Sequence, residues 1–230
     1  MKGTYEKLTK GIKQYFQKSK ISKAVIGLSG GIDSALSLKL VADAIGNNNI
    51  TALIMPEKGL TKLQNVKDAI HLCKLLKINY KIIGINNILK NFKKQNKTSW
   101  LNLKPRIRML ILYNYANANN ALVIGTSNKT ELKLGYFTKY GDGAVDIEVI
   151  GDLYKTEVWL LAKYLKLPER IINKVPSAEL YKDQTDEGQI GAKYKDIDAM
   201  LQGKKEINKR VKELIEKNKH KTEKVPIIKV

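Results

Sequence analysis

The residues of this chain whose types and spacing most clearly predict chemistry lie at positions 28–35, which read LSGGIDSA. An apolar, β-branched run (23–28, KAVIGL) precedes them, and apolar residues recur at helical spacing from 33 to 45. Two glycines at a strand-to-helix corner allow a tight turn and a close approach of the backbone to a ligand. Amides at the start of a helix bind anions, and Asp33 places a carboxylate where Mg²⁺ would lie beside a phosphate. Residues 28–35 therefore predict a phosphate loop with a magnesium site.

Patterns that the sequence lacks narrow the type of this loop. There is no G-x-x-x-x-G-K-[ST] run, and no G-x-G-x-x-G follows the strand. The SGG-x-DS pattern instead resembles the pyrophosphate loop of the ATP pyrophosphatases. Those enzymes cleave ATP between its α- and β-phosphates, adenylate a carboxylate or carbonyl oxygen, and let a nitrogen or sulfur nucleophile displace AMP. The resemblance implies ATP as a co-substrate.

Strands that alternate with helices must position the loop. The expected strands and helices are a helix at 5–18, strands at 23–28, 50–55, 80–85 and 121–125, and a long helix at 105–118. This order is typical of an α/β fold, a doubly wound parallel sheet flanked by helices and Rossmann-like. Ligands of such sheets bind at the carboxyl ends of strands, where both the phosphate loop and the segment after Gly125 lie.

One helix between these strands has a predicted start and a predicted buried face. Thr61 and Gln64 have the spacing of a capping box. The apolar residues that follow at helical spacing are Leu63, Val66, Ile70, Cys73 and Leu76.

Several further motifs, taken in chain order, carry a family resemblance. They are NLKPRIRM at 102–109, GTSNKTELKLGYFTKYGDGAVDIEVI at 125–150, GDLYKTEVWLLAK at 151–163, PSAEL at 176–180 and DQTDEGQIG at 183–191. Together with the phosphate loop, they resemble the NAD synthetases over about residues 5–226. The resemblance implies an ATP pyrophosphatase fold and ATP-dependent amidation of deamido-NAD (nicotinic acid adenine dinucleotide). The carboxylate would be adenylated with release of pyrophosphate, and ammonia would then displace AMP.

The resemblance also implies roles for individual residues. The ATP-binding residues would be Gly27, Leu28, Ser29, Gly30, Gly31, Ile32, Asp33, Ser34, Thr126, Lys155 and Ser177. The contacts to deamido-NAD would be Arg106, Lys139, Asp146, His220 and Lys221. Asp33 and Glu131 would be the Mg²⁺ ligands, and Asp33 and Lys155 would act in catalysis.

Ammonium must lose a proton before it attacks, and Asp142 and Asp186 are the candidates to accept it, with Asp142 the expected catalytic one. Some of these residues have a second interpretation by type alone. Arg106 could be an exposed helix charge, Glu131 a favourable charge in a first helical turn, and Asp142 a turn former in a glycine-rich loop.

Composition limits the other classes of function. The net charge of +20 suits a nucleic-acid binder, but the lysines are spread over most predicted elements, as is typical of solvated faces, so we do not expect nucleic-acid binding. The charge is typical of a lysine-rich proteome or of thermal adaptation, and attraction of anionic nucleotides would be a side effect. No apolar run approaches the ~20 residues that cross a bilayer, and the first 18 residues lack a signal-peptide core, so we expect a cytoplasmic protein without membrane contact. The one cysteine, Cys73, excludes an internal disulfide and disfavours a cysteine nucleophile.

We expect residues 1–230 to form a single NAD synthetase domain without a glutaminase domain, so that free ammonia supplies the nitrogen. A separate glutaminase subunit is the alternative source of that ammonia. The resemblance implies a homodimer, with the helix at 105–118 as one interface element. The segment 181–191, rich in acidic residues and glycine, predicts a flap that closes over the adenylate, although Lys182 and Asp183 replace a Pro-Gly pair common in the family. The alternatives are another amidotransferase or a tRNA-modifying enzyme on the same fold, and a basic RNA-binding module.

Overall fold

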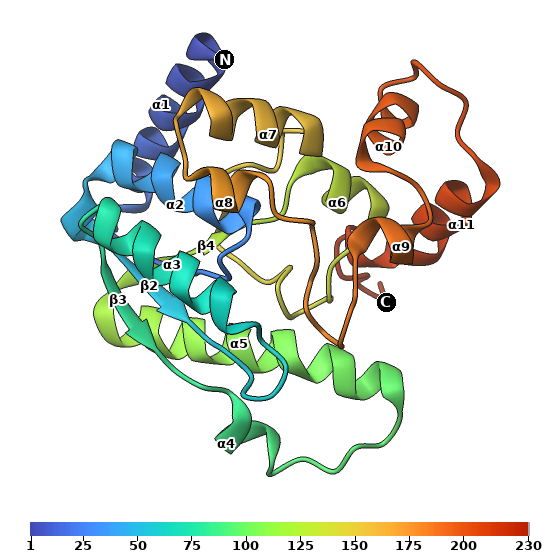
Figure 1. Ribbon diagram of the computed structural model, residues 1–230, viewed down its shortest axis with the longest axis horizontal. Helices are drawn as coiled ribbons and strands as arrows, with labels where there is room; N and C mark the ends of the chain where they lie inside the picture. Colours follow the sequence, from blue (N-terminus) through green and yellow to red (C-terminus); the bar gives the residue numbers. More distant parts are fainter. Residues whose placement is uncertain (230) are drawn as a thin grey trace.

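The computed structural model describes residues 1–229, in which five parallel strands form one sheet (Figure 1). The strands are β1 (Lys23–Gly27), β2 (Ile50–Ile54), β3 (Asn79–Ile82), β4 (Ala121–Gly125) and β5 (Ile147–Glu148), in the order β3-β2-β1-β4-β5. The register pairs Val25 with Thr51 on one side and with Val123 on the other. The sequence did not predict β5, because a two-residue strand is too short to show an alternating pattern.

Helices cover both faces of the sheet. They are α1 (Lys2–Ser19), α2 (Ile32–Ile45), α3 (Leu63–Leu75), α4 (Asn86–Leu89), α5 (Lys97–Asn119), α6 (Lys129–Leu134), α7 (Lys155–Tyr164), α8 (Glu169–Ile172), α9 (Asp186–Ile190), α10 (Tyr194–Leu201) and α11 (Lys209–Asn218), with short 3₁₀ turns at Asn47–Asn49 and Lys219–Lys221. The helices α1, α2, α3, α7 and α8 pack on one face, against Ala24 and Ile26 of β1. On the other face, α4 and α5 pack against Val25. The predicted doubly wound α/β fold is confirmed.

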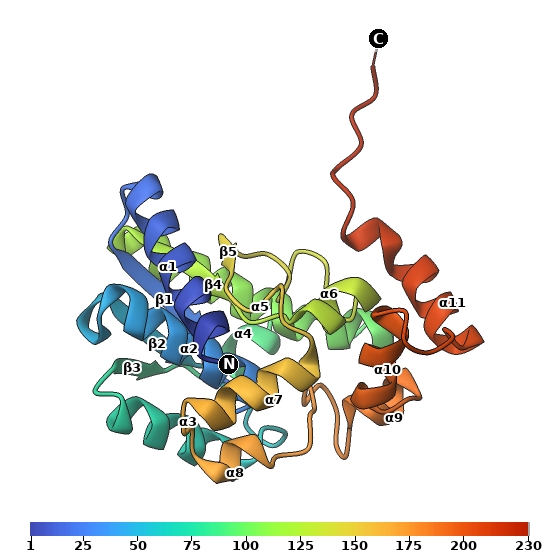
Figure 2. The same cartoon turned by 90° about the horizontal axis from the view of Figure 1, so that it is seen from above.

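A smaller apolar layer lies beyond the sheet. Residues of α6, α9, α10 and α11 bury Leu134, Ile190, Tyr194 and Val211 together. These helices lie side by side in both Figure 1 and Figure 2, and the chain then leads away from the body after the last 3₁₀ turn (Figure 2). None of the helices in residues 1–229 combines the length and the apolar character that a bilayer crossing requires.

The long helix α5 begins earlier than the sequence predicted. Its first residue is Lys97, and Asn96 and Ser99 form a capping box in which each side chain bonds the other residue's backbone amide. Pro105, the predicted start, lies inside the helix. The proline lacks an amide hydrogen, yet the helix continues through it to Asn119, with Lys104 and Pro105 both buried.

The predicted start of α3 is wrong. Lys62 is the N-cap, and no side chain caps the helix. The Thr61 hydroxyl accepts the Glu57 amide hydrogen at 3.0 Å, and the Gln64 side chain donates to Asp68 at 2.7 Å. Leu63 is 67% exposed and so does not belong to the predicted buried face.

Candidate active site

The order of the strands places a crevice at the carboxyl ends of β1 and β4. From β1 the chain builds the sheet outward through β2 and β3, and then returns to add β4 on the opposite side of β1. Ligands of doubly wound sheets bind where the direction of winding reverses in this way. The phosphate loop follows β1, and Thr126, Ser127 and Asn128 follow β4, so two loops that are far apart in sequence meet at this edge.

The phosphate loop has the geometry of an anion site. The Ser29 and Ser34 hydroxyls lie 3.0 Å apart, and the Gly31 amide donates to the Ser29 hydroxyl at 3.1 Å. Gly30 has φ +80°, and a side chain there would collide with the backbone of Asn65 in α3. No side chain caps α2, so the amides of its first turn stay available for an anion with the helix dipole behind them.

Three charged side chains meet beside this loop. The Lys155 ammonium, whose side chain is 1% exposed, pairs with Asp33 and lies 3.7 Å from Glu131. The Asn128 side chain donates to the other Asp33 oxygen at 2.9 Å. Burial, and then the neighbouring Asp33, raise the pKa of the Glu131 carboxyl to about 8. Burial alone would lower the pKa of Lys155, but the two carboxylates outweigh it and raise that pKa.

A buried hydrogen-bond network fixes the elements that carry Glu131 and Lys155. Asn128 and Glu131 form a capping box at the start of α6. The Thr130 hydroxyl accepts the Lys155 amide hydrogen at 3.0 Å and donates to Asp198 of α10 at 2.5 Å. The second Asp198 oxygen accepts the amide of Thr156 at 2.8 Å, which caps α7. Asp198 therefore holds the starts of α6 and α7 in one arrangement.

The carboxylate of Asp186, at the start of α9, anchors the segment that contains Ser177. It accepts hydrogen bonds from the Tyr136 hydroxyl (3.3 Å), the Tyr194 hydroxyl (3.3 Å) and the Ala178 amide (3.1 Å). Burial raises the pKa of Asp186, while Lys155 acts in the opposite direction. Asp186 thus brings a further carboxylate toward Lys155, and it lies within the predicted flap.

The residue just before that flap is hydrogen-bonded to α5. The buried Lys104 ammonium donates to the Leu180 carbonyl at 2.8 Å and lies 2.8 Å from the Glu57 carboxylate. The Ser177 hydroxyl accepts the Glu179 amide hydrogen at 3.1 Å. The pattern of the sequence does not predict a role for Lys104, because a lysine in a helix is most often exposed.

Two residues after β4 complete the same edge. Thr126 is half-buried in the loop directly after the strand. The Ser127 amide donates to the Glu148 carboxylate of β5 at 3.0 Å, and that side chain packs against Gly125, where a Cβ would collide with it. Burial raises the pKa of Glu148 to about 7.

The structure brings four of the five predicted substrate contacts together. The Arg106 guanidinium donates to the Lys139 carbonyl at 3.3 Å, and the Lys139 ammonium donates to the His220 carbonyl at 2.6 Å. The Lys221 ammonium donates to the carbonyls of Gly135 and Phe137, at 2.8 Å each. The side chains of Arg106, Lys139 and Lys221, from α5, from the loop after α6 and from the C-terminal turn, thus form one cationic group, which His220 joins through its backbone carbonyl.

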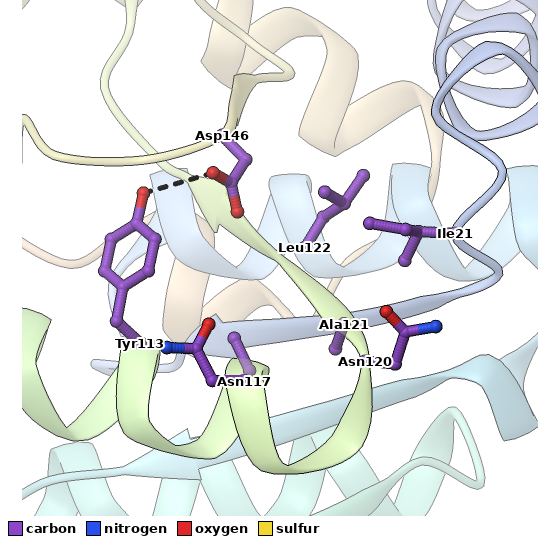
Figure 3. Close-up of a pocket in the computed structure, with 8 residues that line it drawn as sticks. Ile21, Tyr113, Asn117, Asn120, Ala121, Leu122 and Asp146 are labelled. Carbon is purple, nitrogen blue, oxygen red and sulfur yellow. Dashed lines mark hydrogen bonds between the residues drawn. The ribbon is translucent and has the colours of Figure 1, made fainter.

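Asp142 lies near this group and Asp146 does not. The Asp142 carboxylate accepts the Thr138 amide hydrogen at 2.9 Å; desolvation raises its pKa, while the Thr138 amide and Lys221 lower it. Asp146 instead accepts the Val123 amide hydrogen at 2.7 Å, beside the middle of β4. Figure 3 shows the Tyr113 hydroxyl pointing at Asp146, to which it donates at 3.2 Å, and both residues line a pocket of about 330 Å³ between α5 and β4.

Comparison with known proteins decides the family. A family model described as NAD synthase matches residues 4–229. The chain belongs to the NAD synthase family. An NH3-dependent NAD+ synthetase of Archaeoglobus fulgidus is 46% identical, over 98% of this chain and 96% of the relative. One from Methanocaldococcus jannaschii is 43% identical, over 96% of this chain and 94% of the relative.

Solved structures of the NAD synthase family agree in fold. An NMN synthetase from Francisella tularensis superposes with a TM-score of 0.91 at 35% identity, covering 100% of this chain and 98% of that one. An NH3-dependent NAD synthetase from Campylobacter jejuni has a TM-score of 0.82 at 35% identity, covering 99% of each chain. The family resemblance and the ATP pyrophosphatase fold predicted from the motifs are confirmed.

Several residues that support the site were not predicted from the sequence. These are Asn128, Thr130, Glu148 and Asp198. Only Asn128 carried a readable signal, because Asn128 and Glu131 have capping-box spacing. The others are single polar residues in helices, strands or loops, and their partners are distant in sequence.

Proposed function

We propose that this chain is an ammonia-dependent NAD synthetase, a ligase that forms a C–N bond. It transfers AMP from ATP to the carboxylate of deamido-NAD with release of pyrophosphate, and ammonia then displaces AMP to give NAD. The arrangement of Asp33, Glu131 and Lys155 beside an uncapped phosphate loop supports this proposal most strongly. Its position at the carboxyl ends of β1 and β4, in a member of the NAD synthase family, adds to that support.

The nicotinate carboxylate is anionic and resonance-stabilised, so it is a poor acyl donor until it is adenylated. The phosphate loop, Thr126 and Ser177 would hold ATP, with the α2 amides directed at its phosphates. The Lys155 ammonium, fixed by Asp33 and Glu131, would offset charge that develops at the α-phosphate as the leaving pyrophosphate departs.

The residues present fit a magnesium ion. Asp33 and Glu131 approach the same ammonium from neighbouring strand ends, so their carboxylates can share one cation. No cluster of three or more His, Cys, Asp or Glu side chains in residues 1–229 could hold a metal ion alone. Two carboxylates suit Mg²⁺, which keeps waters and phosphate oxygens in its shell. When bound, Mg²⁺ would neutralise phosphate charge.

The cationic group of Arg106, Lys139 and Lys221, together with the neighbouring His220, would bind deamido-NAD, which carries a carboxylate and a pyrophosphate. Asp146 lies apart from this group, in the pocket between α5 and β4. We therefore propose a homodimer in which the Asp146 pocket of one subunit meets substrate held by the other. Leu110, 58% exposed on α5 near Tyr113, suits such an interface, and light scattering should give a mass near twice 26.0 kDa.

We propose that free ammonia supplies the nitrogen, because relatives matched over nearly their whole length are named NH3-dependent NAD+ synthetases. We also propose that residues 1–230 form a single NAD synthetase domain that acts in the cytoplasm. Asp142 lies near the cationic group, its pKa is raised by desolvation, and it would take the proton from ammonium. Asp142→Asn should raise the ammonium concentration needed for half-maximal rate. Unchanged ammonium saturation and an unchanged rate in that variant would remove Asp142 from this role.

A second candidate substrate is nicotinate mononucleotide, a smaller nucleotide that carries the same free nicotinate carboxylate but lacks the AMP part of deamido-NAD. The superposition on the Francisella tularensis NMN synthetase favours it, while curated relatives at 41–48% identity are named NAD+ synthetases. Both substrates present the same carboxylate, so the chemistry would not change. Of the two, we propose deamido-NAD as the substrate.

Purified protein should be assayed with ATP, Mg²⁺, ammonium chloride and either nicotinate substrate, and the amidated product, AMP and pyrophosphate should be followed together. We expect NAD, AMP and pyrophosphate in equal amounts with deamido-NAD, and a higher kcat/KM than with the mononucleotide. Asp33→Ala should abolish all three. Asp43→Ala is the matched control, because Asp43 lies on the same helix and pairs with Lys39. Faster turnover of the mononucleotide would assign the second substrate, and absence of AMP would contradict the proposal.

A further inference from the structure

A lysine outside the residues discussed above reaches back onto the phosphate loop. Lys174, which follows α8, donates to the Gly30 carbonyl at 2.5 Å and to the Asp68 carboxylate of α3 at 2.9 Å. The helix α8 packs on α2, which places this segment beside the loop (Figure 1). One ammonium therefore connects the turn of the phosphate loop to two other elements of the fold.

The peptide that Lys174 contacts has few steric restraints of its own. It joins two glycines, Gly30 and Gly31, so no Cβ on either side restricts its orientation. In a trans peptide the carbonyl and the amide hydrogen point in opposite directions. Lys174 holds the Gly30 carbonyl, so the Gly31 amide points the other way, toward the Ser29 hydroxyl at 3.1 Å. That side of the loop also carries the Ser34 hydroxyl and the start of α2.

Asp68 fixes the lysine. Its carboxylate is buried, and it also accepts from the Gln64 side chain at 2.7 Å and lies 3.7 Å from the Arg170 guanidinium. Burial alone would raise the pKa of Asp68, but the hydrogen bonds from Lys174 and Gln64 outweigh it and lower that pKa. The lysine thus has two acceptors in fixed places, which limits where its ammonium can lie.

We infer that Lys174 is a positioning residue for ATP: it clamps the Gly30–Gly31 peptide so that the Gly31 amide faces the phosphates, and Asp68 holds it in place. The inference rests on the proposed function, in that the loop's ligand is the pyrophosphate part of ATP. Lys174 lies three residues before Ser177, so the same segment would support the loop and contact the nucleotide.

Binding of magnesium pyrophosphate, measured by calorimetry, tests this without turnover. Losing a charge-assisted hydrogen bond that orients a cradle amide should weaken binding about tenfold in Lys174→Met. Lys174→Arg can still donate to both acceptors, so it should bind within about threefold of the natural protein. Lys163→Met removes an exposed charge and should bind unchanged. In turnover, the KM for ATP should rise about tenfold in Lys174→Met, while kcat and the KM for deamido-NAD stay within about twofold.

NMR of protein labelled with nitrogen-15 glycine observes this peptide directly. The chain has 16 glycines, so the spectrum contains few amide resonances. In the ligand-free protein the Gly31 amide, assigned by its loss in Gly31→Ala, should give one sharp resonance. Lys174→Met should broaden or split it, because the peptide is then held from one side only. A role confined to neutralising Asp68 would leave this resonance unchanged.

Lys174→Met leaves Asp68 with one partner fewer, so the variant could lose stability. If it unfolds at the assay temperature, Asp68→Asn/Lys174→Met, which also removes the buried charge, is measured with the same expectation. Unchanged pyrophosphate binding in folded Lys174→Met, or equal weakening in Lys163→Met, would overturn the inference. If the natural protein binds no magnesium pyrophosphate, the proposed ATP site itself fails. The two failures are therefore distinguishable.

Discussion

Replacing Lys155 by methionine should destabilise the protein, and more strongly as the pH rises. Methionine keeps most of the volume of the buried side chain but removes the ammonium that Asp33 and Glu131 share. Without divalent cations, two carboxylates would then face each other across a buried site. The folded protein can relieve this repulsion only by binding a proton, which it does more readily at low pH.

The magnitude follows from the geometry. Unit charges 3.7 Å apart, the distance from Lys155 to Glu131, attract by about 4.5 kcal/mol at an effective dielectric constant of ~20. Desolvation of the lysine offsets part of this, and breaking one partner of a buried pair costs about 3–5 kcal/mol. We therefore expect a loss of about 3 kcal/mol or more near pH 9.

The sign of the pH dependence follows from Glu131. Its folded pKa of about 8 lies above the ordinary value of 4.5, so the folded state keeps a proton that the unfolded state loses. Stability falls as the pH rises between these values, and removing Lys155 raises the folded pKa further. Near pH 5.5 Glu131 is protonated in both proteins, so the loss in Lys155→Met should shrink to about 1–2 kcal/mol.

Urea unfolding at both pH values, without divalent cations, measures the difference. Lys163→Met, on the exposed side of the same helix, is the matched control and should change stability by less than about 0.5 kcal/mol. A loss of equal size at both pH values, or a larger loss at the lower one, would refute the reasoning. So would full stability of Lys155→Met near pH 9.

Three further predictions test other parts of the fold and site. Burial raises the pKa of Glu148 to about 7, above its ordinary value of 4.5, so the natural protein loses stability as the pH rises between these values. Glu148→Gln does not titrate there, so its stability relative to the natural protein should be about 2 kcal/mol higher near pH 7.5 than near pH 5. Urea unfolding of both proteins at both pH values measures this, and the opposite sign would contradict it. Cys73 is buried and its pKa is raised to about 11, so a thiol reagent should label it in denaturant but not in the native state; rapid native labelling would show that α3 opens. Thr130→Val removes the hydroxyl that bonds Asp198 and the Lys155 amide, so it should lower stability by about 2 kcal/mol and reduce kcat. Thr130→Ser keeps the hydroxyl and should restore both. Equal activity of the two variants would show that this hydroxyl does not position Lys155.

The sequence predicted those parts of the fold that depend on local patterns. The strands at β1, β2 and β4 were predicted to within one residue, because they are short apolar runs bounded by turn residues. The start of α5 was missed because Pro105 is a common first residue of a helix, whereas the actual cap lies at Asn96. The capping box at Thr61 was wrong because the loop before α3 uses that hydroxyl for the Glu57 amide instead.

The contacts at the candidate site could be predicted only where a motif carried them. The pairing of Lys155 with Asp33 spans 122 residues, and no periodicity in either segment indicates it. Asp198 and Lys174 look like ordinary charges near exposed lysines, and only the folded chain shows that Asp198 caps α7 and that Lys174 contacts Gly30. Asp146 has a site-like glycine-rich context, yet its bonds to Val123 and Tyr113 place it at the side of the sheet.

The most direct test of carboxylate adenylation follows an oxygen atom of the nicotinate carboxylate into the products. Deamido-NAD labelled with oxygen-18 in its nicotinate carboxylate should be turned over with ATP, Mg²⁺ and ammonium, and the AMP analysed by mass spectrometry. Attack of that carboxylate on the α-phosphate, followed by displacement by ammonia, leaves one carboxylate oxygen on the phosphate of AMP. We therefore predict one labelled oxygen in each AMP and none in pyrophosphate. Unlabelled AMP, or ADP with labelled inorganic phosphate, would contradict adenylation at this site.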